Sequence, residues 1–334
     1  MGTDEVGSLI CSYIEQSQNP DIQDYGAGLL RDLRAGAAQR YFWELHYAME
    51  LGKLHNCRVL DIGCGFGWNA MYLALCGNNE IVALDIRETM TAPLDEFLSK
   101  LRSRGRNIPI TTLTGDVCAM DFEPESFDAV YSNEAIEHIR DLDVMFGKCR
   151  QLLKPGGSFV FVNDSNALNS QTRTSTQEMW EMRDNSWACI EEILKERPIE
   201  NQGIAPFAVM RARIIREANP TLTTDDVEML AAATAGMVQA EIRELSIGFG
   251  PGTVLPVRPP LSWCRSPLTG EYCERLLDPY ELQEMAAKNG LRGRIYHTYR
   301  RFPQSLLNRI QLRPLGDLLF NIRRQFALAG ERIE

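Results

Sequence analysis

A glycine-rich turn between an apolar run and a helix-forming run is the feature that most constrains the fold of this chain. The stretch reads VLDIGCGFGWNA over residues 59–70, with glycines at 63, 65 and 67. Glycine lets the backbone approach another group closely because it has no Cβ atom. A helix that starts directly after such a turn presents unpaired N–H groups and the positive end of its dipole. The stretch therefore predicts a strand, a ligand-binding turn and a helix in direct succession.

Strand-like and helix-like segments alternate from residue 58 to residue 163. Short apolar runs typical of strands occupy residues 58–62, 80–85, 110–113, 127–132 and 157–163. Apolar residues at helical spacing lie between them, at residues 68–75, 94–104 and 141–153. This alternation predicts an α/β fold with a doubly wound parallel sheet. Two later strands are expected at residues 291–299 and 323–332, after a helix that begins at Pro279 and is capped by Asp278.

The alternation stops between residues 165 and 275, which divides the chain into four predicted parts. A length of 334 residues accommodates one large α/β domain with insertions, or two small domains. Residues 24–55 have helical spacing. We expect an N-terminal helical cap (1–54), a core (55–164), a helical and loop lid insertion (165–275) and a C-terminal completion of the sheet (276–334). Within the lid, a helix capped by Thr223 or Thr224 is expected to continue through residue 245.

The composition indicates which binding partners and which cellular compartment to expect. The formal net charge is −10. Because a protein that binds nucleic acid needs a basic face, we do not expect nucleic-acid binding over the whole surface. No apolar run reaches the length of a membrane span, and the acidic N-terminus lacks the pattern of a signal peptide. The nine cysteines form no CxxC pair, and Cys264 and Cys273 are too isolated to predict a zinc site. We therefore expect a cytoplasmic protein with reduced thiols.

Acidic residues follow the next two predicted strands and bear on the identity of the ligand. Asp85 ends the second strand, where a carboxylate can accept hydrogen bonds from both hydroxyls of a ribose. Asp116 follows the third strand, where it can accept from an adenine amino group. A dinucleotide and S-adenosylmethionine (SAM) are both compatible with Asp85, and Asp116 discriminates better between them.

Five motifs together resemble the class I SAM-dependent methyltransferase family. They are VLDIGCGFG, ALDI, TGDV, FDAVYSNEAIEHI and LLKPGGSFVFV, in order within residues 55–165, with a looser match over 276–334. The resemblance implies a seven-stranded Rossmann-like sheet whose last strand is antiparallel, with SAM bound at the carboxyl ends of the strands. It also implies a set of cofactor-binding residues, which are Asp61, Gly63, Cys64, Gly65, Gly67, Asp85, Ile86, Asp116, Val117 and Asn133.

The same resemblance implies roles for these residues. Asp61 and the three glycines would line the methionine and ribose portions of SAM, and Asp85 would hold the ribose. Asp116 and Val117 would hold the adenine. Asn133 would lie near the transferred methyl group.

The string E-A-I-E-H after the fourth strand holds the predicted catalytic residues, Glu134, Glu137 and His138. The two glutamates are three residues apart and are expected to share a helix face beside the histidine. Two carboxylates and an imidazole can hold a cation such as Mg²⁺, with Asp164 or His297 as a further ligand. Such a string resembles one associated with metal binding in ubiquinone-pathway O-methyltransferases and small-RNA 2′-O-methyltransferases. Two other interpretations stay open: His138 as a metal-free general base, and a structural role.

Acceptor recognition is expected in the lid and near the C-terminus. Five aromatic residues could form a wall over an acceptor or pack the lid core, namely Trp180, Trp187, Phe207, Phe249 and Trp263. Three arginines on one predicted helix could meet an anionic substrate or form a solvated face, namely Arg211, Arg213 and Arg216. Residues 300–324 carry six arginines and interleaved leucines, so they could contact an anionic membrane surface or pack between the last strands.

These features predict a SAM-dependent methyltransferase that acts on an oxygen atom of a small-molecule acceptor, ahead of nitrogen or carbon, with metal assistance as one variant. One alternative is methylation of a lipid-linked or saccharide acceptor at a membrane surface. Another is a non-catalytic SAM-fold partner protein. The GxGxG spacing and the KPGG turn disfavour an NAD-dependent oxidoreductase, and small-RNA methylation rests on the E-x-x-E-H string alone. The sequence determines neither the acceptor nor the oligomeric state.

Overall fold

The computed structural model describes residues 2–188, 190, 205–297, 319–320 and 325–333. The chain divides into two compact units. The first, which we call the sheet unit, comprises Met1–Ile136, Asp141–Asp164 and Pro279–Glu334. The second, which we call the helical unit, comprises Glu137–Arg140 and Ser165–Asp278.

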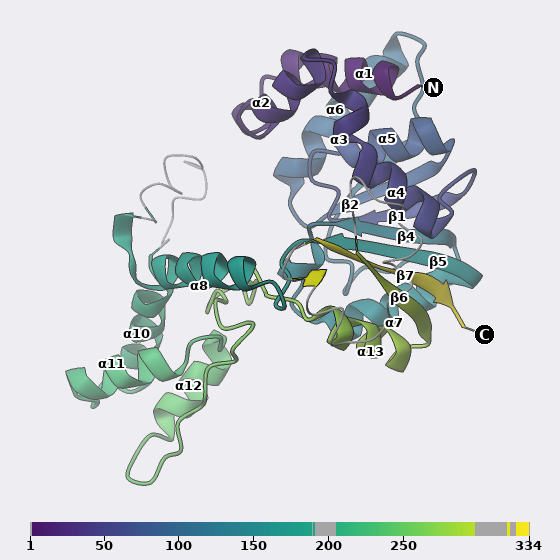
Figure 1. The fold of residues 1–334 in the computed structure, drawn as a ribbon. Helices are drawn as coiled ribbons and strands as arrows, with labels where there is room; N and C mark the ends of the chain where they lie inside the picture. Colours follow the sequence, from purple (N-terminus) through teal and green to yellow (C-terminus); the bar gives the residue numbers. More distant parts are fainter. Residues whose placement is uncertain (1, 189, 191–204, 298–318, 321–324, 334) are drawn as a thin grey trace. The chain divides into compact units, whose positions relative to one another are not determined.

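Seven strands form one sheet in the order β3-β2-β1-β4-β5-β7-β6 (Figure 1). In chain order, the strands are β1 (Arg58–Ile62), β2 (Glu80–Asp85), β3 (Ile110–Thr114), β4 (Phe127–Asn133), β5 (Leu153–Asn163), β6 (Leu291–His297) and β7 (Phe326–Arg332). The first five strands pair in parallel, whereas β7 is antiparallel to both β5 and β6. The prediction of a doubly wound, seven-stranded Rossmann-like sheet is therefore confirmed.

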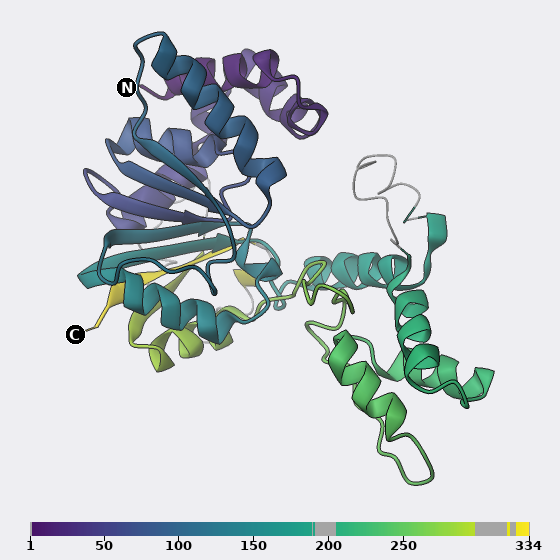
Figure 2. The ribbon, with the colours of Figure 1, turned by 180° about the vertical axis from the view of Figure 1, so that it is seen from behind.

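Helices cover both faces of the sheet (Figures 1 and 2). On one face lie α4 (Trp43–Gly52), α5 (Trp68–Gly77) and α6 (Glu88–Ser103), and on the other lie α7 (Leu142–Leu152) and α13 (Pro279–Lys288). Because the inner parallel strands β1, β2 and β4 are then buried on both sides, their central residues are mostly apolar. The polar side chains that matter for chemistry are therefore confined to the strand ends.

The predicted helical region 24–55 is not one helix. Before α4 the chain forms α1 (Thr3–Gln16), α2 (Pro20–Arg34) and the short α3 (Ala38–Tyr41). Gly36, which follows α2, has a φ of 76°, a left-handed conformation that ends the helix. Side chains of α1 to α6 share one core with the sheet face that they cover, so the N-terminal helices belong to the sheet unit.

The helical unit contains α8 (Ser170–Asn185), α10 (Phe207–Ala218), α11 (Thr224–Ala233) and α12 (Gln239–Ile247). Thr223 is the predicted cap of α11, and its side chain accepts a hydrogen bond from the amide of Asp226 at 3.2 Å. The prediction that this helix continues to residue 245 is wrong. The chain turns between α11 and α12, where Gly236 has a φ of 92° that no residue with a Cβ adopts easily.

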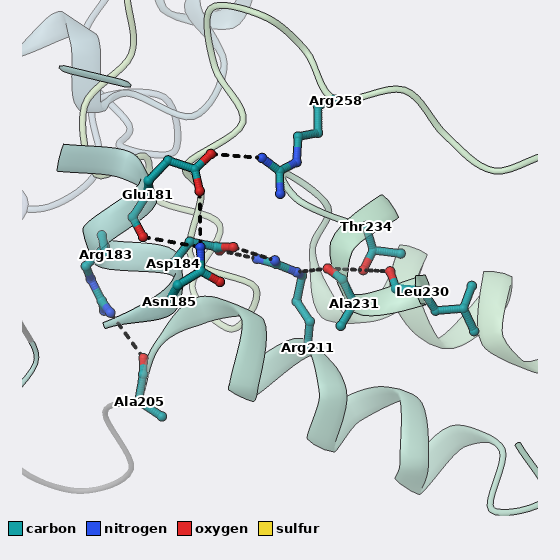
Figure 3. Close-up of polar contacts among 10 residues, drawn as sticks. All are labelled: Glu181, Arg183, Asp184, Asn185, Ala205, Arg211, Leu230, Ala231, Thr234 and Arg258. Carbon is teal, nitrogen blue, oxygen red and sulfur yellow. Dashed lines mark hydrogen bonds and ion pairs between the residues drawn. The ribbon is translucent and has the colours of Figure 1, made fainter. Parts of the chain in front are cut away.

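A buried ion pair joins two helices of this unit (Figure 3). Both guanidinium Nη atoms of Arg211 donate to the carboxylate of Asp184, at 2.7 and 2.9 Å, and its Nε donates to the carbonyl of Ala231 at 2.6 Å. The side chains of Arg211 and Asp184 are 1% and 2% exposed. The prediction of a solvated face is therefore wrong for Arg211, whereas Arg213 and Arg216 are exposed as that prediction requires.

Two remaining predictions concern membrane contact. Among the residues described, no helix is both long and apolar enough to cross a membrane. The arginine-rich segment 300–324 lies outside the described residues, apart from Leu319 and Phe320.

Candidate functional site

The turn after β1 combines two packed glycines with one that faces open space. All three glycines have positive φ angles, 73° at Gly63, 53° at Gly65 and 79° at Gly67. A Cβ on Gly63 would lie 2.2 Å from the Cβ of Ala135, and one on Gly67 would lie 2.3 Å from Leu94 Cδ2. A Cβ on Gly65 would meet nothing within 4 Å. Gly65 is therefore the position where a ligand can lie against bare backbone.

The carboxylate of Asp85 is held beside this turn. Its Oδ2 accepts from the amide of Gly65 at 3.0 Å, and its Oδ1 accepts from the amide of Arg87 at 3.0 Å. An ionised carboxylate has about four acceptor positions, so roughly two stay available for the hydroxyls of a ribose. Ile86, the next residue, is half exposed. The end of β2 thus presents a fixed acceptor and an apolar side chain.

Asp61 is a buried carboxyl at the end of β1. It is 1% exposed, and its Oδ2 has no hydrogen-bond partner among the residues described. Burial, together with the negative charge of Asp85, raises the pKa of Asp61 to about 8. An unsatisfied buried polar atom costs stability, so its presence points to a group that a ligand satisfies. An ammonium group beside the open turn would fit this oxygen.

The neighbouring strand ends are tied to this edge by hydrogen bonds. The amide of Gly115 donates to the carbonyl of Asp85 at 2.9 Å, which connects the loop after β3 to β2. In that loop the Oδ1 of Asp116 accepts from the amide of Cys118 at 2.9 Å. The hydroxyl of Ser132 donates to the carbonyl of Ile62 at 2.7 Å and so fixes the end of β4 against β1.

The cofactor-binding residues expected from the sequence therefore share one edge of the sheet. They lie at or directly after the carboxyl ends of β1, β2, β3 and β4, and they are Asp61, Gly63, Cys64, Gly65, Gly67, Asp85, Ile86, Asp116, Val117 and Asn133. Cys64 and Val117 are buried, and Asn133 is partly buried. Burial also raises the pKa of the Cys64 thiol well above its usual range, so this side chain serves packing.

The E-x-x-E-H string is arranged differently from the prediction. Glu134 has a φ of 50° directly after β4, and a 3₁₀ turn follows at Ile136–His138, so Glu134 and Glu137 share no helix face. The Oε2 of Glu134 accepts from the amide of Asp164 at 3.1 Å. Glu134 and Asp164 belong to the sheet unit, whereas Glu137 and His138 belong to the helical unit.

The Mg²⁺ site predicted at this string gains no support. In the parts of the chain that the structure describes, no three His, Cys, Asp or Glu side chains form a metal-holding group. His138 Nδ1 lies 3.3 Å from the carbonyl oxygen of Tyr272, and its Nε2 lies 3.7 Å from Glu137 Oε1. His297 is the last residue of β6, and its side chain lies outside the described part. The roles of His138 as a base and of the string as a structural element stay predictions.

Most of the five aromatic residues expected in the lid pack inside the helical unit. Trp180, Phe207 and Trp263 are buried together, and the indole of Trp180 donates to the carbonyl of Glu274 at 2.7 Å. Phe249 is partly buried and packs against a second cluster of the same unit, whereas Trp187 is half exposed. The packing interpretation therefore holds for four of the five residues.

A row of three aromatic side chains beside the glycine turn was not predicted from the sequence. The ring of Phe66 lies 6.1 Å from that of Tyr25 in α2 and 5.7 Å from that of Trp68 at the start of α5. Aromatic residues on both sides of Gly67 were the available signal, but nothing in the sequence placed Tyr25 beside them. This row brings an N-terminal helix to the edge of the candidate site.

Known proteins match the same part of the chain. Residues 60–161 match the family described as "Methyltransferase domain". Sterol 24-C-methyltransferase of Candida albicans is 34% identical over 123 residues, which are 37% of this chain and 31% of that protein. The corresponding enzyme of Clavispora lusitaniae is 36% identical over 104 residues, which are 31% of this chain and 27% of that protein. The match thus spans less than a third of the length of these two relatives.

Among solved structures, geranyl diphosphate C-methyltransferase from Streptomyces coelicolor aligns with a TM-score of 0.44 and 12% identity. The alignment covers 96% of this chain and 84% of that one. Together, the strand order, the glycine turn and the family match over residues 60–161 lead to one classification. The chain contains a class I SAM-dependent methyltransferase domain.

Proposed function

We propose that the protein transfers the methyl group of SAM to a small-molecule acceptor. The observation that carries this proposal is the unsatisfied, buried Oδ2 of Asp61 beside a turn in which Gly65 faces open space. SAM has an α-ammonium group that can donate to Asp61, and ribose hydroxyls that can donate to the fixed carboxylate of Asp85. Asp116 would accept from the adenine amino group.

Methyl transfer from SAM requires little of the protein beyond positioning of the reactants. The bound cofactor supplies a methyl carbon that is already activated by a positive sulfur. Residues at the sheet edge would hold it in one orientation, and the apolar walls formed by Ile86 and Phe66 would exclude water. Asn133 would lie on the methyl side, where the acceptor must approach.

The acceptor atom is a finer part of the proposal. Oxygen is the first candidate for the acceptor atom, because the imidazole of His138 could take the proton of a hydroxyl in the metal-free interpretation. A carbon acceptor is the second candidate, because the two sterol methyltransferases aligned with this domain are named for methylation at carbon. With an acceptor in hand, a ¹³C-labelled methyl donor distinguishes the two, since O-methyl and C-methyl carbons have different NMR chemical shifts. Turnover with and without EDTA tests metal assistance in the same assay.

Cofactor binding is the first experiment. Calorimetric titration of SAM, S-adenosylhomocysteine and NAD into the protein should give binding of the first two ligands only. Asp85→Ala should weaken SAM binding roughly 10- to 100-fold, because losing charge-assisted hydrogen bonds costs about 1.5–3 kcal/mol. Asp121→Ala, at an exposed acid of the same unit, is the matched control and should bind as the wild type does. Absence of SAM binding in the wild type would favour the non-catalytic partner protein instead.

A further inference from the structure

Cys264 and Cys273 face each other across a short hairpin in the helical unit. Arg265 and Tyr272 are antiparallel bridge partners, and the amide of Cys273 donates to the carbonyl of Cys264 at 2.9 Å. The amide of Ser266 donates to the carbonyl of Glu271 at 2.8 Å, which continues the same register. Directly opposed residues of this kind have Cα atoms about 5.5 Å apart. Disulfides span Cα separations of about 4.4–6.8 Å, so the backbone already suits a cross-link.

The two thiols are chemically different although their backbones are paired. Cys264 is completely buried, and Cys273 is partly exposed. Interaction with the Cys264 thiol lowers the pKa of Cys273 against the opposing effect of burial, and the positive charge of Arg183 also lowers it. The same interaction, followed by burial, raises the pKa of Cys264. Because the thiolate is the reactive form, Cys273 is the attacking sulfur and Cys264 the resolving one.

We propose that Cys264 and Cys273 are a redox-active dithiol that closes to an intramolecular disulfide by exchange with a low-molecular-weight disulfide such as oxidised glutathione. In the first step the Cys273 thiolate attacks one glutathione sulfur, a mixed disulfide forms, and one glutathione thiolate leaves. In the second step Cys264 gives up its proton and attacks the Cys273 sulfur, and the second glutathione thiolate leaves. Two protein thiols are thereby oxidised and one small disulfide is reduced to two thiols.

Closing this bond would rigidify the hairpin that holds residues 137–140. The carbonyl of Tyr272 contacts His138 Nδ1 at 3.3 Å, and the carbonyl of Thr269 accepts from Arg140 at 3.4 Å. Arg275 lies over the ring of Tyr272 at 4.0 Å and donates to the carbonyl of Ile139 at 2.5 Å. A disulfide between positions 264 and 273 would brace this contact surface from within the hairpin. The oxidation state of the pair would thus act on the segment that carries His138.

Mass spectrometry of the full-length protein tests the dithiol directly. The chain is equilibrated in glutathione buffers from fully reduced to fully oxidised, blocked with a maleimide and digested with trypsin. Cleavage after Arg265 separates the two cysteines, so a disulfide appears as a linked pair of peptides. We expect this pair to become the main form of both peptides in oxidised buffer and to disappear when reduced glutathione is restored. Its absence in oxidised buffer would overturn the proposal.

Single variants test the assigned roles. Cys264→Ser should stop after the first step and retain one glutathione on Cys273, and Cys264→Ala repeats the test in case serine disturbs the buried position. Cys273→Ser should leave Cys264 unmodified, because that thiol is buried. The matched control is Cys11→Ser, at a partly buried thiol whose pKa burial raises, and it should form the disulfide as the wild type does. If Cys273 in Cys264→Ser gains glutathione no faster than Cys11, the proposed reactivity is wrong.

Discussion

At the scale of single residues, Asp61 is the side chain whose charge state should report cofactor binding. With a pKa of about 8, its carboxyl holds a proton in the free protein at pH 6.5. If the ammonium of SAM pairs with the ionised carboxylate, binding at this pH must release close to one proton. Calorimetry in two buffers of different ionisation enthalpy measures this number, and Asp61→Asn should release none. Wild-type binding without proton release would mean that Asp61 stays protonated in the complex.

The same residue makes stability depend on pH. Asp61 titrates near 3.8 when unfolded and near 8 when folded, so between these values the unfolded chain binds fewer protons and stability falls as pH rises. Its contribution is fully present below pH 4 and is lost by about pH 8. Asp61→Asn removes this dependence. The melting temperature of the variant relative to wild type should therefore rise by several °C between pH 4 and pH 8 and stay level above it. If the difference in melting temperature between Asp61→Asn and the wild type does not change with pH, the assigned pKa is wrong.

The sequence anticipated these site residues but not their state. The order of motifs was enough to place Asp61, Asp85 and Asp116 at successive strand ends, because parallel strands align their carboxyl ends at one edge. That Asp61 would be buried with an unsatisfied oxygen depends on tertiary packing around the end of β1, which the motif order does not reveal. Arg211 is the opposite case, since its helical spacing gave no sign of a buried partner on another helix.

At the scale of elements, the glycine turn should separate a packing role from a binding role. Gly67→Ala would force a side chain into a left-handed backbone and against Leu94, at a cost of about 2–4 kcal/mol in free energy of unfolding. Gly65→Ala meets no atom, so it should cost only about 1–2 kcal/mol, yet its methyl group occupies the space where SAM would lie. Urea denaturation should rank Gly67→Ala as less stable, and titration should rank Gly65→Ala as the weaker binder per folded molecule. If the two variants lose stability and SAM affinity to the same extent, the separate packing role of Gly67 and binding role of Gly65 are wrong.

Element boundaries were predicted well wherever periodicity alone decides them. The ranges of β1 and β2 match the prediction, because short apolar runs between polar residues leave little freedom. Two errors fall where a single residue adopts a left-handed conformation: Gly236 separates α11 from α12, and Glu134 follows β4 where a helix was expected. Two predicted starts were late, since α6 begins at Glu88 and β5 at Leu153. A glycine within a helical pattern is tolerated often enough that the sequence does not reveal which one breaks it.

At the scale of the whole molecule, the two units should differ in what they contribute. All the expected SAM contacts lie in the sheet unit, whereas the Arg211–Asp184 pair lies in the helical unit and connects α8, α10 and α11 (Figure 3). Removing one partner of a buried ion pair leaves an uncompensated charge and typically costs about 3–5 kcal/mol. Asp184→Asn should therefore speed amide hydrogen exchange in these three helices while leaving the Kd for SAM within about twofold of wild type.

Two further variants make that prediction specific to the pair. Glu181→Gln, on the same helix, alters an exposed contact with Arg258 at 3.3 Å and should change stability by no more than about 0.5 kcal/mol. The double variant Asp184→Leu with Arg211→Met replaces the pair by apolar groups and should recover much of the lost protection, because neither charge is then buried alone. If Asp184→Asn instead weakens SAM binding as much as it speeds exchange, the cofactor site depends on the helical unit. Cofactor binding would then require both units, and the sheet edge alone would not account for it.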